Sequence, residues 1–419
     1  MYHALMRSTR VAALALLALC GAAVHAQDWP QFRGPTGQGH AEARGLPLQW
    51  SETQNVKWKV PVGGLGWSSP VVAQGRVWLT TSVEVPASGR ERAGLSLRAL
   101  AFDADTGKRV VDVEVFRLTQ LRPLNEKNSF ASPTPILDGD RVYVHFGADG
   151  TAALSTSGEI LWKARYNYDS QHGGGGSPVL YNDLLIFNCD GNEVEAFVVA
   201  LDARTGKERW KRDRRRPAAQ AYTTPLVITA NGRDQLISVG AYRAGAYDPA
   251  TGREIWRVAY DDGFSNVPRP VFGKGLVFIA TGFYEPKLIA VRPDGEGDVT
   301  RSHLAWTLVR GVPYTVSPLL VGEELYVVSD TGVLTLVDAA SGKVHYQQRL
   351  GGNYSASPVL ADGRIYFLSE EGVATVIAPG KTFNRLAVNR LDGATLASMA
   401  MSGGAIYVRS DSHLYRISS

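Results

Sequence analysis

A short motif recurs along the chain and most constrains how it can fold: a hydroxyl residue and a proline, followed about nine residues on by an apolar run. The copies are Ser69-Pro70, Thr134-Pro135, Ser177-Pro178, Thr224-Pro225, Ser317-Pro318 and Ser357-Pro358. Arg269-Pro270 is a seventh copy with arginine in the first place, and Ser398 begins an eighth in which Met399 replaces proline. Successive copies are 65, 43, 47, 45, 48, 40 and 41 residues apart, mostly near the period of four-stranded propeller blades.

Each copy predicts one antiparallel blade. The stretch from Ser317 to Tyr346 contains four short apolar runs separated by glycine-containing turns, which is typical of a meander of four strands. A second half-motif, Asp-x-x-Thr-Gly followed by an aromatic residue, recurs as LDARTGKERW, YDPATGREIW and related sequences. Asp and Thr side chains stabilise such a turn, glycine takes the positive φ, and the aromatic ring can wedge between neighbouring blades.

The two ends of the chain predict that the ring is closed. After Ser398 only two further strand runs fit, so the last blade lacks its outer strand. The run from Asn55 to Val62 (NVKWKVPV) can supply it, with Trp58 in the place of Trp210, and closure removes exposed sheet edges. We therefore predict an all-β fold, an eight-bladed β-propeller of four-stranded antiparallel blades over residues 55–419. Residues 27–54 are expected to form an N-terminal arm over its surface.

The first 26 residues have the pattern of a Sec signal peptide. Arg7 and Arg10 precede the apolar run from Val11 to Val24, and Val24-His25-Ala26 provides a cleavage site. A lipobox-like sequence ends at Cys20, but Leu19 stands where a small residue is preferred, so lipid anchoring at Cys20 is the less favoured alternative. We expect a periplasmic or secreted monomer without a transmembrane segment, since no later run approaches the ~20 apolar residues a spanning helix needs.

The charge balance gives no support for a nucleic-acid partner. The formal charge of +4 falls to about +2 once Arg7 and Arg10 are removed. One basic cluster, Arg204 to Arg216 (RTGKERWKRDRRR), is interpreted as a solvated outer strand and loop, with an anionic docking patch as the alternative.

These repeats resemble the PQQ-like (quinoprotein alcohol dehydrogenase-like) β-propeller repeats over nearly the whole mature chain. The resemblance rests on Ser-Pro at the inner strand and on A-L-D-x-x-T-G-x-x-x-W at the outer turn. That family includes pyrroloquinoline-quinone dehydrogenases and non-catalytic relatives such as the scaffold lipoprotein of the outer-membrane β-barrel assembly machinery. It implies a docking role between blades, rather than cofactor contact, for Trp58, Trp162, Trp210, Trp256 and Trp306.

Signals for catalysis are weak. The quinone enzymes of the family use adjacent cysteines, a Ca²⁺ ion with acidic ligands and an Asp base, whereas Cys189 has no cysteine neighbour. Asp190, Glu193 and Glu195 are interpreted as an acidic exposed turn rather than as Ca²⁺ ligands. The eight histidines show no metal-ligand spacing, and neither a nucleophile elbow nor a phosphate loop is present. No cofactor is expected; PQQ with Ca²⁺ belongs to the alternative, an oxidoreductase of alcohols or sugars.

An aromatic or polar residue precedes most of the anchors, where first strands enter the central channel. We predict that these residues form a ligand-binding channel mouth, with Arg122, Lys127 and Arg243 nearby; they are Trp67, Phe130, His172, Tyr222, Asn266, Arg269, Tyr314 and Tyr354. The alternative is that these side chains belong to the core between blades.

Two further stretches depart from the repeat. The excess length of the first interval lies in Ser82 to Leu95 and Phe116 to Ser132, which we interpret as loops that carry specificity. Four glycines, Gly173 to Gly176, either admit a ligand closely or form a tight crossing between blades. We predict an exported, non-catalytic binding or scaffold protein, with a protein, a small molecule or a glycan as its unidentified partner.

Overall fold

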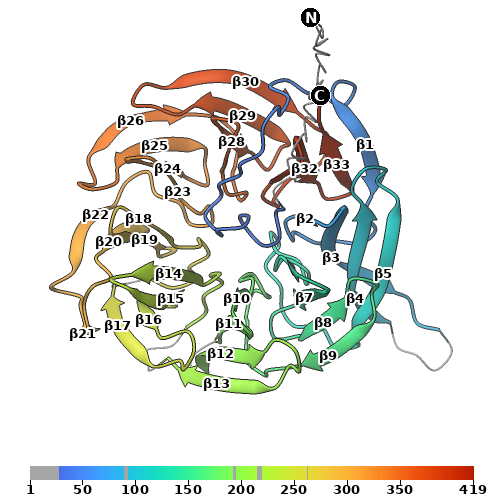
Figure 1. Cartoon of the computed structure of the whole chain (residues 1–419), viewed down its shortest axis with the longest axis horizontal. Helices are drawn as coiled ribbons and strands as arrows, with labels where there is room; N and C mark the ends of the chain where they lie inside the picture. Colours follow the sequence, from blue (N-terminus) through green and yellow to red (C-terminus); the bar gives the residue numbers. More distant parts are fainter. Residues whose placement is uncertain (1–27, 89–92, 192–194, 215–218, 262) are drawn as a thin grey trace, which may run out of the picture.

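The structure, a computed structural model, describes residues 28–88, 93–191, 195–214, 219–261 and 263–419. The predicted signal peptide, Cys20, Glu193, Arg215 and Arg216 therefore lie outside the described residues. The described strands form eight antiparallel sheets arranged as blades around a central axis (Figure 1). This confirms the all-β, eight-bladed propeller. No helix within the described ranges is long and apolar enough to span a bilayer.

The blades follow one another in chain order. Blades 1 to 4 consist of β2 (Val71–Ala73), β3 (Arg76–Val85), β4 (Gly94–Asp103) and β5 (Arg109–Leu118); β6 (Ile136–Asp138), β7 (Arg141–His145), β8 (Thr151–Ser155) and β9 (Ile160–Ala164); β10 (Val179–Tyr181), β11 (Leu184–Asp190), β12 (Ala196–Asp202) and β13 (Glu208–Asp213); and β14 (Leu226–Ala230), β15 (Arg233–Val239), β16 (Arg243–Tyr247) and β17 (Glu254–Ala259).

Blades 5 to 8 consist of β18 (Val271–Gly273), β19 (Leu276–Thr281), β20 (Lys287–Val291) and β22 (Leu304–Leu308); β23 (Leu319–Val321), β24 (Glu324–Val328), β25 (Val333–Asp338) and β26 (Val344–Arg349); β27 (Val359–Ala361), β28 (Arg364–Leu368), β29 (Val373–Ala378) and β30 (Asn384–Arg390); and β31 (Ala400–Ser402), β32 (Ala405–Arg409), β33 (His413–Ile417) and β1 (Val56–Pro61). A short strand, β21 (Gly297–Asp298), leaves blade 5 and pairs in parallel with β17 of blade 4.

The hydroxyl groups of the repeated anchors link six pairs of neighbouring blades around the axis. The backbone N–H at the anchor of one blade donates to the side-chain oxygen at the anchor of the following blade, over 2.8 to 3.1 Å. The donors and acceptors are Ser69 and Thr134, Thr134 and Ser177, Ser177 and Thr224, Arg269 and Ser317, Ser317 and Ser357, and Ser357 and Ser398. The hydroxyl is therefore kept because it satisfies a buried donor of the neighbouring blade.

The predicted tryptophan docking is confirmed in four places. The ring of one blade covers the left-handed glycine of the next Asp-x-x-Thr-Gly-type turn, and its Nε1 donates to a carbonyl of that turn over 3.0 to 3.1 Å. A Cβ on that glycine would lie 2.5 to 2.8 Å from the ring. Glycine is thus required both for its φ and for the space. The pairs are Trp58 and Gly107, Trp162 and Gly206, Trp210 and Gly252, and Trp306 and Gly342.

Trp256 departs from this arrangement. Blade 5 has no Asp-x-x-Thr-Gly turn, so the Nε1 of Trp256 donates to Gln235 Oε1 of its own blade at 2.8 Å. The ring is fully buried and packs in a cluster with Val291, the last residue of β20 in blade 5, and with Val299, which follows β21. Trp256 therefore still joins two blades, through apolar packing of its ring and through the parallel pairing of β17 with β21.

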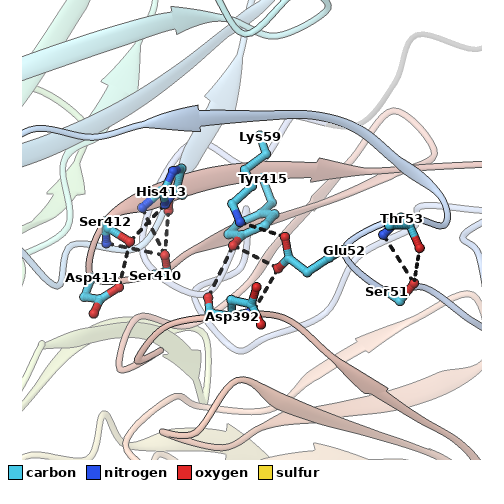
Figure 2. A network of polar contacts seen from close by, with 10 residues as sticks. All are labelled: Ser51, Glu52, Thr53, Lys59, Asp392, Ser410, Asp411, Ser412, His413 and Tyr415. Atoms are coloured by element: carbon cyan, nitrogen blue, oxygen red, sulfur yellow. Dashed lines mark hydrogen bonds and ion pairs between the residues drawn. The ribbon is translucent and has the colours of Figure 1, made fainter.

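The N-terminal strand closes the ring as predicted. β1 pairs antiparallel with β33, the last strand of the chain (Figure 1). Figure 2 shows the polar contacts beside this seam. Glu52 accepts hydrogen bonds from Lys59 Nζ at 2.7 Å, from the backbone N–H of Asp392 at 2.8 Å and from the Tyr415 hydroxyl at 3.1 Å. Burial alone would raise the pKa of the Glu52 carboxyl. The hydrogen bonds lower it by a larger amount, so the pKa lies below the ordinary value of 4.5.

We expect Glu52→Gln to destabilise the fold at pH 7 by at most about 1 kcal/mol, because the ion pair with Lys59 is partly exposed. A carboxylate with a lowered pKa stabilises the fold above its unfolded-state value and loses that contribution as the pH falls through the folded-state pKa. The difference between wild type and variant, measured by urea denaturation, should therefore shrink as the pH falls below 4.5. A difference that stays constant from pH 7 to pH 3 would contradict this.

The N-terminal arm lies across the channel rather than only on the outer surface. Figure 1 shows the segment running from β1 to the centre of the ring. Trp29 forms a backbone bridge with Val72 of blade 1, while the carbonyl of Pro30 accepts from the N–H of Leu137 in blade 2. Farther along, the arm contacts first strands of three more blades, through Gln38 and Phe272, His40 and Leu320, and Gly39 and Leu360.

A buried arginine pair accompanies the arm at the axis. Arg269, the one arginine at an anchor position, donates to Pro225 O at 3.0 Å and to Phe32 O of the arm at 2.8 Å. Burial lowers the pKa of Arg269 to about 9, and burial together with Arg269 lowers that of Arg33 to about 9. Both therefore remain charged at neutral pH. The departure from Ser or Thr at residue 269 is explained by the bond to the arm.

Candidate functional site

The propeller has two faces with different loops. We call top face the one formed by the connections into each first strand and by the turns between second and third strands. The bottom face carries the other turns. The arm lies at the bottom: the N–H of Leu46 donates to Asp362 in the β27–β28 turn at 3.1 Å. The free loops around the channel are therefore those of the top face.

The eight predicted mouth residues lie at the top, in or beside the connections into the first strands, but they do not form a continuous ring. Asn266, Arg269 and Tyr354 are buried, with 1%, 3% and 1% of their surface exposed. Tyr354 belongs to a core cluster that contains Tyr326 and Phe367 of blades 6 and 7. The other five are partly exposed; they are Trp67, Phe130, His172, Tyr222 and Tyr314.

Contacts among the eight are few within the described part of the chain. The rings of His172 and Tyr222 lie 6.1 Å apart, and the N–H of Tyr222 donates to Asn266 O at 2.7 Å. Asn266 is a cross-link between turns: its Nδ2 donates to Gly240 O at 2.7 Å and its Oδ1 accepts from Gly282 N at 2.5 Å. Asn266 thus provides hydrogen-bond partners for backbone groups of two neighbouring turns.

Tyr314 instead belongs to a line of five aromatic rings across blades 4, 5 and 6, which we call the aromatic line. Neighbouring ring centroids are 5.4 to 6.1 Å apart, and the planes are tilted by 39 to 69°. Phe283 and Tyr284 are 53% and 72% exposed. In order, the rings belong to Tyr242, Phe264, Tyr284, Phe283 and Tyr314.

Rigid second and third strands hold the aromatic line in place. Phe283 and Tyr284 occupy the turn between β19 and β20, where Gly282 has φ +85° and its N–H is bound by Asn266. Tyr242 sits in the β15–β16 turn with φ +63°, an uncommon conformation for a residue with a side chain. The sequence prediction included Tyr314 alone of these rings. Two adjacent aromatic residues in a turn, where polar residues are usual, were the available signal.

The loop after the long first blade crosses the top face. Lys127 Nζ pairs with Glu370 of blade 7 at 3.1 Å, although the loop starts at β5. On either side of Lys127 the loop also docks on the next connection, where Asn128 Nδ2 donates to His172 O at 2.7 Å and Arg122 to Tyr168 O at 3.1 Å. Arg122 and Lys127 therefore lie on the top face as predicted, but their contacts hold this loop in place.

The other half of the excess length is not a loop. Residues 82–85 and 94–95 extend the β3–β4 pairing, which runs to Val85 and Gly94. The prediction of a specificity loop at Ser82 to Leu95 was therefore wrong for these residues, because alternating Ser, Val and Leu side chains continue the ladder. Residues 89–92 lie outside the described range.

The glycine run forms a tight crossing between blades. A Cβ on Gly174 would lie 2.9 Å from the Cα of Gly147, and one on Gly176 would lie 2.4 Å from Thr223 O. Backbone therefore packs against backbone on both sides of the loop. The space beneath it is only about 10 Å³, enough for about one water molecule.

A buried ion pair lies beneath this loop and corrects two predictions. Asp190 accepts two hydrogen bonds from Arg214 Nη1, at 2.7 and 2.8 Å, and neither side chain is more than 4% exposed. Arg214 Nη2 also donates to Ser238 Oγ. Asp190 is thus not part of an exposed acidic turn, although Glu195 is exposed, and Arg214 is not solvated. Asp190 ends β11 and Arg214 directly follows β13, and in the interior each compensates the other's charge.

No metal site is present among the described residues. No three His, Cys, Asp or Glu side chains within the described ranges lie close enough to hold a metal ion. Cys189 is a free, buried cysteine, and burial raises its thiol pKa well above the ordinary value. These residues do not fit the Ca²⁺ and paired cysteines that the quinone enzymes use, so no redox step is derived for this chain.

A comparison with known protein families matches most of the repeats found in the sequence. The profile of the family described as outer membrane protein assembly factor BamB matches residues 41–239 and 288–386. Outer membrane protein assembly factor BamB of Francisella salina is 28% identical over 177 residues, which are 42% of this chain and 31% of that protein. The match thus spans about a third of the length of this relative.

Solved structures share the fold at low identity. BamB from Moraxella catarrhalis superimposes with a TM-score of 0.57 and 11% identity, covering 86% of this chain and 99% of that one. A europium-containing methanol dehydrogenase gives a TM-score of 0.53 with 12% identity, covering 84% and 89%. The quinohemoprotein alcohol dehydrogenase ADHIIG from Pseudomonas putida HK5 gives 0.53 with 11% identity, covering 93% and 80%. At such identities the likeness concerns the fold alone.

Proposed function

Because this chain belongs to the outer membrane protein assembly factor BamB family, we propose that it is a non-catalytic scaffold that binds a protein partner through the aromatic line. The observation that carries this proposal is the exposure of Phe283 and Tyr284 in the middle of five touching rings on the top face. Participation in outer membrane protein assembly is part of the proposal, and it rests on the names of the relatives.

The aromatic line has the properties of a protein-binding hot spot. A large aromatic side chain buries about 150–250 Å² when it is covered, and aromatic residues are enriched at the centres of interfaces. Contiguous exposed apolar groups of this kind mark interaction sites on soluble proteins. The turns that carry the rings are fixed by Asn266, so little ordering entropy remains to be lost on binding.

Ring orientation favours side chains of a protein over a glycan. Sugar rings stack on flat aromatic faces, whereas the neighbouring planes here are tilted by 39 to 69°. Apolar and aromatic side chains from a partner can pack against the edges and faces of such tilted rings. A glycan therefore becomes the less favoured ligand of this face.

The proposed location is the periplasm, with the chain acting as a monomer that binds no nucleic acid. The support is the signal-peptide pattern around Arg7 and Arg10 and the outer-membrane role named for the relatives. Lipid anchoring at Cys20 stays the less favoured alternative.

We expect Phe283→Ala/Tyr284→Ala to impair outer membrane protein assembly without unfolding the protein. Both side chains are largely exposed, so their removal should change the free energy of unfolding by no more than about 0.5 kcal/mol each. In cells that lack this chain, wild type should restore outer membrane protein levels, and the double variant should restore them several-fold less well, since hot-spot truncation costs about 2 kcal/mol or more.

The matched control is Leu386→Ala/Val388→Ala on the outer strand β30, where both side chains are also exposed. It should complement as well as wild type. Full complementation by the Phe283/Tyr284 variant would refute the aromatic line as the binding surface. A chain whose loss leaves outer membrane protein levels unchanged would refute the assembly role.

A further inference from the structure

The outer strand of blade 1 is unusually long. β5 follows β4 as far as the pair Leu95 and Leu118, because the β3–β4 hairpin is extended. A β-bulge at Val115 interrupts the pairing, so that Val115 and Phe116 are both buried. The second half of β5 thus lies beside the end of β9, the outer strand of blade 2.

A groove of about 490 Å³ separates these two strands on the perimeter of the ring. Its lining residues are Glu114, Val115, Phe116, Arg117, Lys163, Ala164 and Arg165. Phe116 is 5% exposed and packs against Phe146 at 6.0 Å. Lys163 Nζ lies 5.2 Å and the Arg165 guanidinium carbon 4.9 Å from the centroid of its ring.

The groove carries uncompensated positive charge. Glu114 pairs with Arg117 at 3.2 Å and is 3.9 Å from Arg98. Lys163 and Arg165 form no ion pair within the described ranges. Burial raises the pKa of the Asp149 carboxyl, and the nearby charges of Arg122 and Arg165 only partly oppose that rise. Asp149 is itself paired with Arg122 at 3.5 Å. An anionic group entering the groove therefore meets two exposed cations held over one ring.

The backbone beside the groove is also unpaired. β5 is the last strand of the sheet β2-β3-β4-β5, and β9 is the last strand of the sheet β6-β7-β8-β9. An edge strand presents a row of free N–H and C=O groups, onto which an extended peptide can add as a further strand.

From this combination we propose that the groove between β5 and β9 binds an extended acidic segment of a protein. The segment adds to the edge of β5 through its backbone, and its Asp or Glu carboxylates pair with Lys163 and Arg165. This surface lies on the perimeter and is independent of the aromatic line on the top face.

The test uses a fluorescein-labelled peptide of alternating Glu and Val residues and the full chain, with binding followed by fluorescence anisotropy. Binding should be saturable at about 0.05 M ionic strength and weaken as the ionic strength rises to about 0.3 M. Lys163→Glu/Arg165→Glu should weaken it by about tenfold or more, as two charge pairs become two repulsions. Lys163→Gln/Arg165→Gln should weaken peptide binding by an intermediate amount. Because this variant introduces no repulsive charge, it checks that the loss in the glutamate variant does not come from local unfolding.

The matched control is Lys207→Glu/Lys211→Glu on blade 3, which changes the net charge equally; Lys211 also lies over an aromatic ring, Phe197, at 3.8 Å. It should retain binding within about twofold. A peptide N-methylated at alternate residues should not bind, because its backbone cannot pair. Equal affinity of wild type and Lys163→Glu/Arg165→Glu, or equal loss in the control, would overturn the proposal. So would binding of phosphatidylglycerol vesicles, but not peptide, that depends on the same two residues.

Discussion

Trp210→Ala is expected to lower the free energy of unfolding by about 3–5 kcal/mol, the range for removing a large buried aromatic side chain. Trp210 is 9% exposed, its ring covers Gly252 of the next blade, and its Nε1 donates to Pro249 O at 3.1 Å. The substitution removes the contact and leaves a cavity between blades 3 and 4. Urea denaturation followed by circular dichroism measures the effect.

Two further variants separate the contributions of ring and hydrogen bond. Trp210→Phe keeps most of the ring contact and should cost about 1 kcal/mol for the lost bond to Pro249. Gly252→Ala should destabilise the contact between blades 3 and 4 by a comparable free energy, because φ is +69° and the new Cβ would lie 2.5 Å from the Trp210 ring. If Trp210→Ala stayed within about 1 kcal/mol of wild type, the tryptophans would not be the elements that join blades.

Arg214→Met is expected to destabilise the fold by about 3–5 kcal/mol at pH 7, because it leaves the buried carboxylate of Asp190 without a counter-charge. The double variant Asp190→Asn/Arg214→Met should recover part of this loss, since the buried charge is then absent as well. These variants and Asp190→Asn alone are measured by urea denaturation. A double variant whose loss of stability equals the sum of the losses in Arg214→Met and Asp190→Asn would argue against coupling.

The same pair predicts a pH dependence. Burial raises the pKa of Asp190 to about 6, while Arg214 opposes that rise. A carboxyl with a raised pKa holds its proton in the folded state where the unfolded chain has lost it, so stability falls as pH rises from about 4 to about 6. Without Arg214 the pKa rises further. The deficit of Arg214→Met relative to wild type should therefore be larger at pH 8 than at pH 5.

The fold was readable from the sequence because most repeats carry the same local signals. The hydroxyl of Ser317 or Ser357, the proline after it and the glycine of the outer turn recur at the same positions. The hydroxyl and the glycine each take part in a contact between blades. Closure by β1 followed from counting strands after Ser398. Residues that repeat reveal the scaffold, since the same packing problem is solved eight times.

Features that occur once were harder to predict. The arm lies across the channel, where it is bound by Arg269. This arginine stands at the anchor position, at which the other seven copies have Ser or Thr. The ion pair of Asp190 and Arg214 joins the end of β11 to the residue after β13, and nothing in their spacing marks them as a buried pair. Local pattern carries no information about such pairwise compensation.

The candidate site was only partly predictable for the same reason. Residues before the anchors were predicted to line the channel mouth, and Tyr314 does contribute to the aromatic line. Tyr354, in the same position one blade later, is buried in the core. The two tyrosines have different neighbours: the Tyr314 ring contacts the exposed Phe283 in a turn, whereas Tyr354 packs in one core cluster with Tyr326 and Phe367, which lie on strands β24 and β28.

The most direct test of the account is site-specific photo-crosslinking in cells, with p-benzoylphenylalanine in place of Tyr284 on the top face or of Lys343 in an exposed turn of the bottom face. We predict a dominant protein adduct from residue 284, identified by mass spectrometry as an outer membrane protein or a component of its assembly, and little adduct from residue 343. Equal adducts at both positions, or none at residue 284, would contradict a scaffold that binds its partner through the aromatic line.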